Sequence, residues 1–450
     1  MSIYTSQIKT HIIDPVYNAG NFRAEYRLEP DTVYLSNMRI VGLGAVGTGG
    51  TTPYSSLVGA NGVIRQISLY DDNQLLDQLL EVPHFLSFKN LNNSNQDNMD
   101  LNQNLNKNEL GNIWSGLNDV TGVGQQIFGS ILANSRGVCD VAQPNAPANA
   151  TATGWLDLKR VFPLLRNLTS IPTTFFKNLK VVVEYNTDPE LYISNTQRAP
   201  YTTTEAQLIA DEVVGDMGKQ KLGGFQGVSY TSIEHDRVNI PRVGQGNNQP
   251  LVANTVDVAT QSQTLHINGF NNKTVGRMLI QKAPTEPTSY LNGTQLFRYG
   301  KTGSKAFNKE ALQVRVNGSS IIAGKGIVGA NQRLGMLNDV WGNLSLTPFS
   351  NGEAYLSSDA DNRNNFINDG NPSISNLDYY GININNKVED LQIDFERQAI
   401  YLYTSSPVNA GNDNTATNIS DNNQAINLNI FCEVYKQIVP SAGGYNVVYV

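Results

Sequence analysis

Short runs of apolar residues recur along the chain, and each run ends at turn-forming residues. Residues 63–70 (VIRQISLY) alternate between two faces, which is the period of a β-strand. Residues 179–185 (LKVVVEY) contain three consecutive valines, a pattern typical of a strand that is buried on both faces. The sequence therefore predicts a chain built mainly from strands. The other predicted strands span residues 33–43, 228–240, 264–267, 275–281, 312–316, 391–395, 399–403, 426–438 and 445–450.

Turn signals support this reading. Asn-Gly tolerates positive φ at both turn positions and is the strongest short signal for a β-hairpin. Such pairs begin at Asn61, Asn268, Asn292, Asn317 and Asn351. Long polar segments rich in Asn, Asp, Ser or Ala also separate the strands, and we interpret them as loops on a rigid scaffold. These segments span residues 90–108, 143–154, 359–371 and 409–423.

Helical patterns are few and short. They cover residues 74–80, 108–117, 205–217 and 331–341, and the last two are amphipathic. This is too little helix for an α/β enzyme of 450 residues.

The length predicts more than one core, because single cores stop growing near ~250–300 residues. The strand pattern stops after residue 187 and resumes near residue 227. The interval from Ile64 to Val183 is nearly equal to that from Val314 to Cys432, which indicates a tandem pair of similar β-domains. We therefore expect a division into an N-terminal arm (1–30), a first β-sandwich (31–200), a connecting segment with a short helix (201–226) and a second β-sandwich (227–450).

The composition limits the classes of function that the chain can have. Asn occurs 55 times, charged residues make up 16% of the chain and the net charge is −7. Nucleic-acid binding needs clustered Lys and Arg, and the densest basic stretch, residues 219–221, follows an acidic segment. No run approaches the ~18–20 apolar residues of a membrane span, and residues 1–20 lack the apolar core of a signal peptide. Two cysteines, Cys139 and Cys432, make no disulfide framework.

Two glycine motifs match a dinucleotide-binding pattern in letters only. Residues 42–47 fit G-x-G-x-x-G but run into a Gly, Thr and Pro stretch that cannot begin a stable helix. Residues 324–329 do precede a predicted helix, but no acidic residue follows at the ribose spacing. We interpret both as loops.

The titratable residues show no catalytic or metal-binding pattern. His11, His84, His235 and His266 are the four histidines, and no two are close enough in sequence to form a metal-ligand pair. His235 lies between Glu234 and Asp236, but neighbours in a strand point to the opposite face, so both carboxylates cannot orient the ring. We expect a surface histidine there.

Two further candidates are weak. Asp359 and Asp361 begin an acidic loop that resembles a calcium-binding loop. However, Arg363 occupies the next ligand position and no bidentate Glu follows. Cys432 lies in an apolar predicted strand, so we predict that it is a core residue. We therefore predict no catalytic, cofactor-binding or metal-binding residues and no enzyme activity.

Several segments resemble the double jelly-roll major capsid proteins of the adenovirus and tectivirus type, a family that includes virophages and polinton-like viruses. Residues 28–44 (LEPDTVYLSNMRIVGLG) resemble the first strand of that family, and residues 62–77 (GVIRQISLYDDNQLLD) resemble its next strand and turn. The block that closes the first jelly roll resembles residues 155–165, Ile171, Pro172 and residues 179–185. The inter-strand insertions are short, so we expect no tower-like outer domain.

The resemblance implies an all-β fold of two tandem jelly-roll β-sandwiches with a few short helices. It implies a homotrimer that forms a pseudo-hexagonal tile of an icosahedral virion shell, with penton and minor capsid proteins as partners. It also implies an internal membrane or other virion proteins between the shell and the genome, without direct nucleic-acid contact, and synthesis in the host cytoplasm or an assembly compartment. Two alternatives stay open: a virion spike or carbohydrate-binding β-sandwich, and a β-sandwich hydrolase that uses scattered carboxylates.

Overall fold

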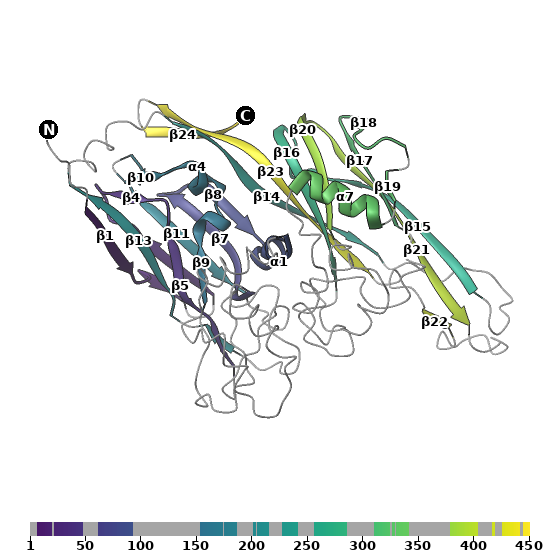
Figure 1. Ribbon diagram of the computed structural model, residues 1–450, viewed down its shortest axis with the longest axis horizontal. Coiled ribbons are helices and arrows are strands. Elements are labelled where there is room, and N and C mark those ends of the chain that lie inside the picture. Colours follow the sequence, from purple (N-terminus) through teal and green to yellow (C-terminus); the bar gives the residue numbers. More distant parts are fainter. Residues whose placement is uncertain are drawn as a thin grey trace.

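The computed structural model confirms an all-β chain with a few short helices (Figure 1). Strands fill two neighbouring regions of the molecule, with the first half of the chain on the left of Figure 1 and most of the second half on the right, while β24 (Gly444–Tyr449) lies at the upper left, above the first half. The structure describes residues 7–19, 22–47, 62–92, 154–173, 175–186, 201–203, 205–215, 227–241, 256–285, 310–324, 326–328, 330–341, 379–403, 416–418, 425–441 and 444–450.

The first half forms two antiparallel sheets and a small ribbon of β6 (Ala45–Gly47) and β12 (Tyr201–Thr203). One sheet has the order β2-β3-β11-β7-β8. In the other, β13 pairs with β1 along one edge and with β4 and β5 along the other, while β10 and β9 extend the sheet beyond β4 and β5. The bounds are β1 (Gln7–Ile13), β2 (Tyr17–Asn18), β3 (Arg23–Arg27), β4 (Val33–Leu35), β5 (Arg39–Leu43), β7 (Ile64–Asp71), β8 (Gln74–Leu80), β9 (Gly154–Asp157), β10 (Ser170–Pro172), β11 (Leu179–Tyr185) and β13 (Gln207–Val214).

The second half forms two further antiparallel sheets. One has the order β14-β23-β16-β20, with β24 paired to the far end of β23. The other has β15-β21-β17, with β18 and β19 beside β17 and β22 beside β21. The bounds are β14 (Val228–Ile240), β15 (Val256–His266), β16 (Lys273–Pro284), β17 (Glu310–Val316), β18 (Ser319–Ser320), β19 (Ile327–Val328), β20 (Tyr379–Val388), β21 (Leu391–Tyr403), β22 (Ala416–Asn418), β23 (Ile426–Ser441) and β24 (Gly444–Tyr449).

One sheet of each half repeats the same strand order. In chain order, both β3-β11-β7-β8 and β14-β23-β16-β20 read first, fourth, second, third. The two halves are therefore similar domains in tandem, as the sequence predicts. The sequence interval that led to this prediction, however, compares strands that are not counterparts. Val183 and Ile64 lie on neighbouring strands of one sheet, whereas Val314 and Cys432 lie in different sheets. The counterpart of β7 is β16, which precedes β17.

Two predicted helices are strands. Residues 74–80 form β8, because a turn at Asp72 (φ 52°) folds them back onto β7. Residues 205–217 were expected to form the helix of the connecting segment, but Gln207–Val214 is β13, paired along its length with β1. Both segments contain apolar pairs that fit either a helix or a buried strand, and pairing with a neighbouring strand decides between them.

The same pairings correct the predicted arm and connecting segment. Strands β1, β2 and β3 of residues 1–30 belong to the sheets of the first sandwich, and so does β13 of residues 201–226. The first sandwich therefore extends beyond its predicted limits of 31–200 at both ends. The limits of the second sandwich, at 227–450, stay a prediction.

The helix predicted at 331–341 is confirmed as α7 (Ala330–Trp341). Residues 82–92, which were not predicted as a helix, form α1 (Val82–Asn92). Shorter helical turns are η3 (Leu158–Arg160) and α4 (Pro163–Asn167). The helix predicted at 108–117 lies outside the described residues, as does almost all of the four predicted loops.

The Asn-Gly prediction holds at one described site. Asn317 and Gly318 have φ of 52° and 78°, which is the hairpin turn between β17 and β18. Asn268 instead begins a crossing from β15 to β16, which lie in different sheets, and the left-handed residue there is Asn272. The pairs at 61, 292 and 351 begin outside the described residues.

Candidate functional site

The described glycines of the two motifs have other structural roles. Gly42 and Gly47 lie in the strands β5 and β6, and no helix follows within the described residues of this segment. Gly326 has φ of 82°, and a Cβ there would lie 2.4 Å from the carbonyl oxygen of Leu312. A glycine is required at this position because the loop passes close to the backbone of β17. This steric requirement accounts for Gly326 in the second glycine motif, residues 324–329.

Two histidines that are distant in sequence meet at the boundary between the halves. His84 of α1 is buried, and burial together with the charge of Arg237 lowers its pKa to about 3. Burial likewise lowers the pKa of His235 to about 4. The His235 ring lies 4.8 Å from the Phe431 ring, and its Nε2 is 3.2 Å from Asn429 Oδ1. His235 is therefore a neutral, half-buried residue rather than the surface histidine that we expected.

The carboxylates beside His235 point elsewhere, as the strand period requires. Glu234 binds Lys273 and Lys436, while Asp236 accepts a hydrogen bond from the backbone of Gly269. Among the described residues, no group of three or more His, Cys, Asp or Glu side chains could hold a metal ion. Cys432 is fully buried, and burial raises the pKa of its thiol, as a core position implies. Asp359, Asp361 and Cys139 lie outside the described residues.

The two halves of the described chain meet at a junction of apolar and polar side chains. Helix α1 from the first half inserts its aromatic side chains into the second. Phe85 lies 5.4 Å from Phe431, and Phe88 lies 5.3 Å from Tyr379 and 5.7 Å from Trp341 of α7. All five residues belong to one continuous buried cluster, so the halves share a core.

A buried carboxylate stands at the centre of the junction. Asp77 on β8 is completely buried and accepts a hydrogen bond from Ser232 Oγ on β14 (2.7 Å). Its other oxygen accepts the backbone N–H of Leu164 (3.2 Å) in α4. Burial raises the pKa of Asp77 to about 6, although these hydrogen bonds and the ammonium of Lys436 favour the charged form. The edge strands of the two halves thus meet through side chains.

Further polar contacts extend the junction on both sides of Asp77. Arg237 pairs with Glu81 at 2.7 Å, and the Tyr230 hydroxyl donates to the Leu76 carbonyl. Near the C-terminus, the Tyr445 hydroxyl donates to Asp71 (2.7 Å). The two halves are thus joined by polar contacts as well as by a shared apolar core.

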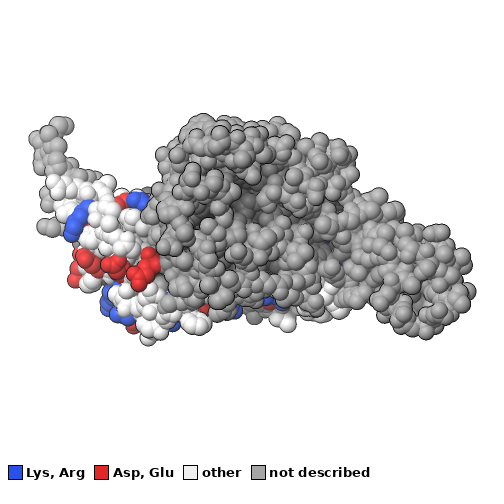
Figure 2. All heavy atoms as spheres, turned by 90° about the horizontal axis from the view of Figure 1, so that it is seen from below, with Lys and Arg blue, Asp and Glu red and all other residues white. Residues whose placement is uncertain are grey.

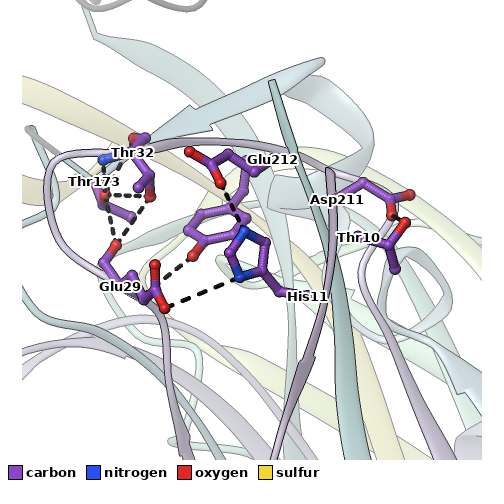
Figure 3. Close-up of polar contacts among 8 residues, drawn as sticks. Thr10, His11, Glu29, Thr32, Thr173, Asp211 and Glu212 are labelled. Carbon is purple, nitrogen blue, oxygen red and sulfur yellow. Dashed lines mark hydrogen bonds and ion pairs between the residues drawn. The ribbon is translucent and has the colours of Figure 1, made fainter. Parts of the chain in front are cut away.

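A second polar cluster anchors the N-terminal strand β1 to the first half (Figure 3). His11 points inward, with Nε2 2.6 Å from Glu212 on β13 and Nδ1 4.0 Å from Glu29. Its ring packs edge-on against Tyr34 at 5.8 Å. On the opposite face of β1, Thr10 donates a hydrogen bond to Asp211 (2.7 Å). Sequence reasoning missed this cluster because its members are far apart in the chain.

The outer face of β1 carries exposed apolar side chains. Ile8 and Ile12 are each 63% exposed and flank Thr10 on that face. Val16, Tyr17 and Phe22, which follow in the chain, are also exposed. Within the described residues, no helix is long and apolar enough to cross a lipid bilayer.

Comparison with solved structures shows which known proteins share this fold. No family model and no curated protein matches the chain. The PBCV-1 protein VP54, in a crystal structure fitted into a cryo-EM reconstruction of the virophage Sputnik, superposes with a TM-score of 0.54 at 11% identity, over 100% of this chain and 98% of that chain. The cryo-EM structure of the Sputnik virophage gives 0.52 at 9% identity, over 100% and 89%. The mavirus major capsid protein gives 0.50 at 10% identity, over 98% and 90%.

At these identities the likeness concerns the fold. It spans both halves, and it agrees with the repeated strand order and the shared core. The chain therefore has the double jelly-roll fold of these viral major capsid proteins.

Proposed function

We propose that this chain is a viral major capsid protein, which assembles as pseudo-hexagonal homotrimers into an icosahedral shell. The observation that carries the proposal is the likeness to capsid proteins over essentially the whole chain, with the two jelly rolls in tandem. The many contacts at the junction suit this role, because a tile keeps its shape only if its two lobes hold a fixed angle.

The role is structural rather than catalytic. The buried titratable groups Asp77, His84 and Cys432 all lie inside the fold, where they serve packing and domain contact. The partners are other copies of the chain, then penton and minor capsid proteins, and an internal membrane or other virion proteins lie between the shell and the genome. The protein is made in the host cytoplasm or an assembly compartment and resides in the virion.

Size-exclusion chromatography with light scattering tests the proposal. We expect a species of three times the chain mass, and negative-stain images of it should show tiles of pseudo-hexagonal outline. A strictly monomeric protein under assembly-like salt would contradict the proposal. A selective ligand on a glycan array, with no trimer, would favour the carbohydrate-binding alternative, and turnover in a glycoside or ester panel would favour the hydrolase.

A further inference from the structure

Strand β1 is an edge strand with an open side. Among the described residues, β13 is the strand that pairs with β1, and it occupies one edge along all seven residues of β1. In Figure 1, β1 lies at the outer left margin of the first jelly roll. No other strand of the described residues pairs with the opposite edge, whose backbone N–H and C=O groups are therefore a template for another strand.

Natural edge strands usually carry features that prevent such pairing, such as Pro, bulges or inward-pointing charges. Strand β1 (QIKTHII) has no Pro within it, and its register with β13 runs without a bulge. Lys9, on the inner face, is the one Lys or Arg of β1 and the single protective feature of this kind in the strand. The two isoleucines on its outer face are 63% exposed. The unbroken register and the exposed isoleucines favour pairing.

The sequence of β1 is complementary to itself. If two copies pair antiparallel about Thr10, Ile8 of each copy faces Ile12 of the other, and the two Thr10 side chains face each other. All of these side chains lie on the outer face. On β13, Val213 stands beside Ile8 and Ile209 beside Ile12. Each outer row of the joined sheets then reads valine, isoleucine, isoleucine, isoleucine.

Charge complementarity supports the same register on the inner face. Pairing about Thr10 places Lys9 of the second copy opposite His11. His11 Nδ1 lies 4.0 Å from a Glu29 carboxylate whose side chain is 64% exposed. The ammonium of the second copy's Lys9 is thus brought within reach of this carboxylate, and the two-fold symmetry repeats the contact.

Charges of both signs lie at this end of the molecule. Seen from below, the described surface at the left end carries a row of Asp and Glu side chains, with Lys and Arg side chains on either side of the row (Figure 2).

We propose that β1 pairs antiparallel with β1 of a second copy across a two-fold axis and joins the sheets of two jelly rolls. The proposal rests on the proposed function, in which the two copies belong to neighbouring trimers. A two-fold contact is self-complementary, and a seven-residue pair makes about six to eight main-chain hydrogen bonds. A contact this small is individually weak, and its repetition around each tile would stabilise a shell.

Cross-linking of full-length protein tests the register. Thr10→Cys in a Cys139→Ser background places two thiols at the centre of the pair, within reach of a short bismaleimide. Thr260→Cys on β15, also an exposed threonine in a strand, is the matched control. We expect linked chain pairs for Thr10→Cys and background linkage for Thr260→Cys. Under native conditions the linked species should contain two trimers.

A second measurement uses the apolar contacts. Ile8→Thr combined with Ile12→Thr keeps β-branched side chains and should weaken trimer–trimer association roughly tenfold in sedimentation experiments. Val328→Thr, at a position 48% exposed on β19, should leave association unchanged. Trimers that form normally, with Thr10→Cys linking no better than Thr260→Cys, would overturn the pairing while leaving the proposed function intact. Absence of trimers in the wild type would instead count against the proposed function.

Discussion

Asp77 makes the stability of the junction depend on pH. Its pKa is raised by burial from 3.8 to about 6, so the folded protein binds the proton more tightly than the unfolded chain. The contribution is therefore fully present below about pH 4 and is lost as the pH rises through 6. At ~1.36 kcal/mol per pKa unit, this shift is worth about 3 kcal/mol.

Asp77→Asn removes the titration and leaves the shape of the side chain. We expect the free energy of unfolding of the wild type to fall by about 2 kcal/mol relative to the variant between pH 4 and pH 7, which spans most of the transition. Comparison at each pH cancels the titration of all other groups. The assay is urea denaturation followed by tryptophan fluorescence, to which Trp341 contributes at the junction beside Phe88.

The control is Asp72→Asn, which removes one carboxylate from the exposed turn of the same hairpin. Its pH profile should follow that of the wild type. If the difference between the wild type and Asp77→Asn stays constant within about 0.5 kcal/mol across this range, then Asp77 is not a strained buried charge. The hydrogen bonds from Ser232 and Leu164 would in that case fully offset its burial.

Three further substitutions test packing and backbone geometry, each by urea denaturation. Phe88→Ala should cost about 3–5 kcal/mol, because its ring fills the space between Tyr379 and Trp341. Gly381→Ala should cost about 1–3 kcal/mol, because the added Cβ would lie 2.8 Å from the Cα of Leu337 in α7. Asn317→Val should cost about 2 kcal/mol, because a β-branched residue is strained at φ of 52° and loses the hydrogen bonds that Asn317 Oδ1 accepts from the backbone.

Each of these has a control in the same chain. Phe22→Ala, at a ring 64% exposed, should be nearly neutral. Gly335→Ala, on α7 with no atom within 4 Å of the added Cβ, should stabilise by about 0.5–1 kcal/mol. Asn317→Gly should retain most of the stability that Asn317→Val loses. If a test variant and its control behave alike, the stated packing or backbone cause is wrong.

The sequence predicted well those elements whose pattern reflects burial. The bounds of β11 and β14 match the predicted ranges, because a run such as Val181 to Val183 is typical of a strand buried on both faces. Prediction failed at β8 and β13. In β8, the spacing of Leu75, Leu76, Leu79 and Leu80 fits one face of a helix as well as a strand. Strand β1 gave almost no signal, since four of its seven residues are polar and its outer face is exposed.

The candidate surfaces were beyond sequence reasoning for a physical reason. His11 and Glu212 are 201 positions apart, and Asp77 and Ser232 are 155 apart. Local propensity and spacing carry no information about which distant strands become neighbours. The resemblance to capsid proteins supplied the architecture, but nothing in it placed the buried carboxylate at the junction.

The chemistry of the junction explains how two similar sandwiches hold one orientation. Among the described residues, β8 and β14 are not joined by a backbone ladder, so no main-chain register fixes one half against the other. Apolar contacts such as Phe85 on Phe431 stabilise the contact but tolerate sliding, because they are not directional. Hydrogen bonds require defined geometry, so the bond from Ser232 to Asp77 and the Arg237–Glu81 pair favour one position. We therefore interpret the buried carboxylate as a group that fixes orientation rather than adding stability, which is the property that the proposed capsid tile would require.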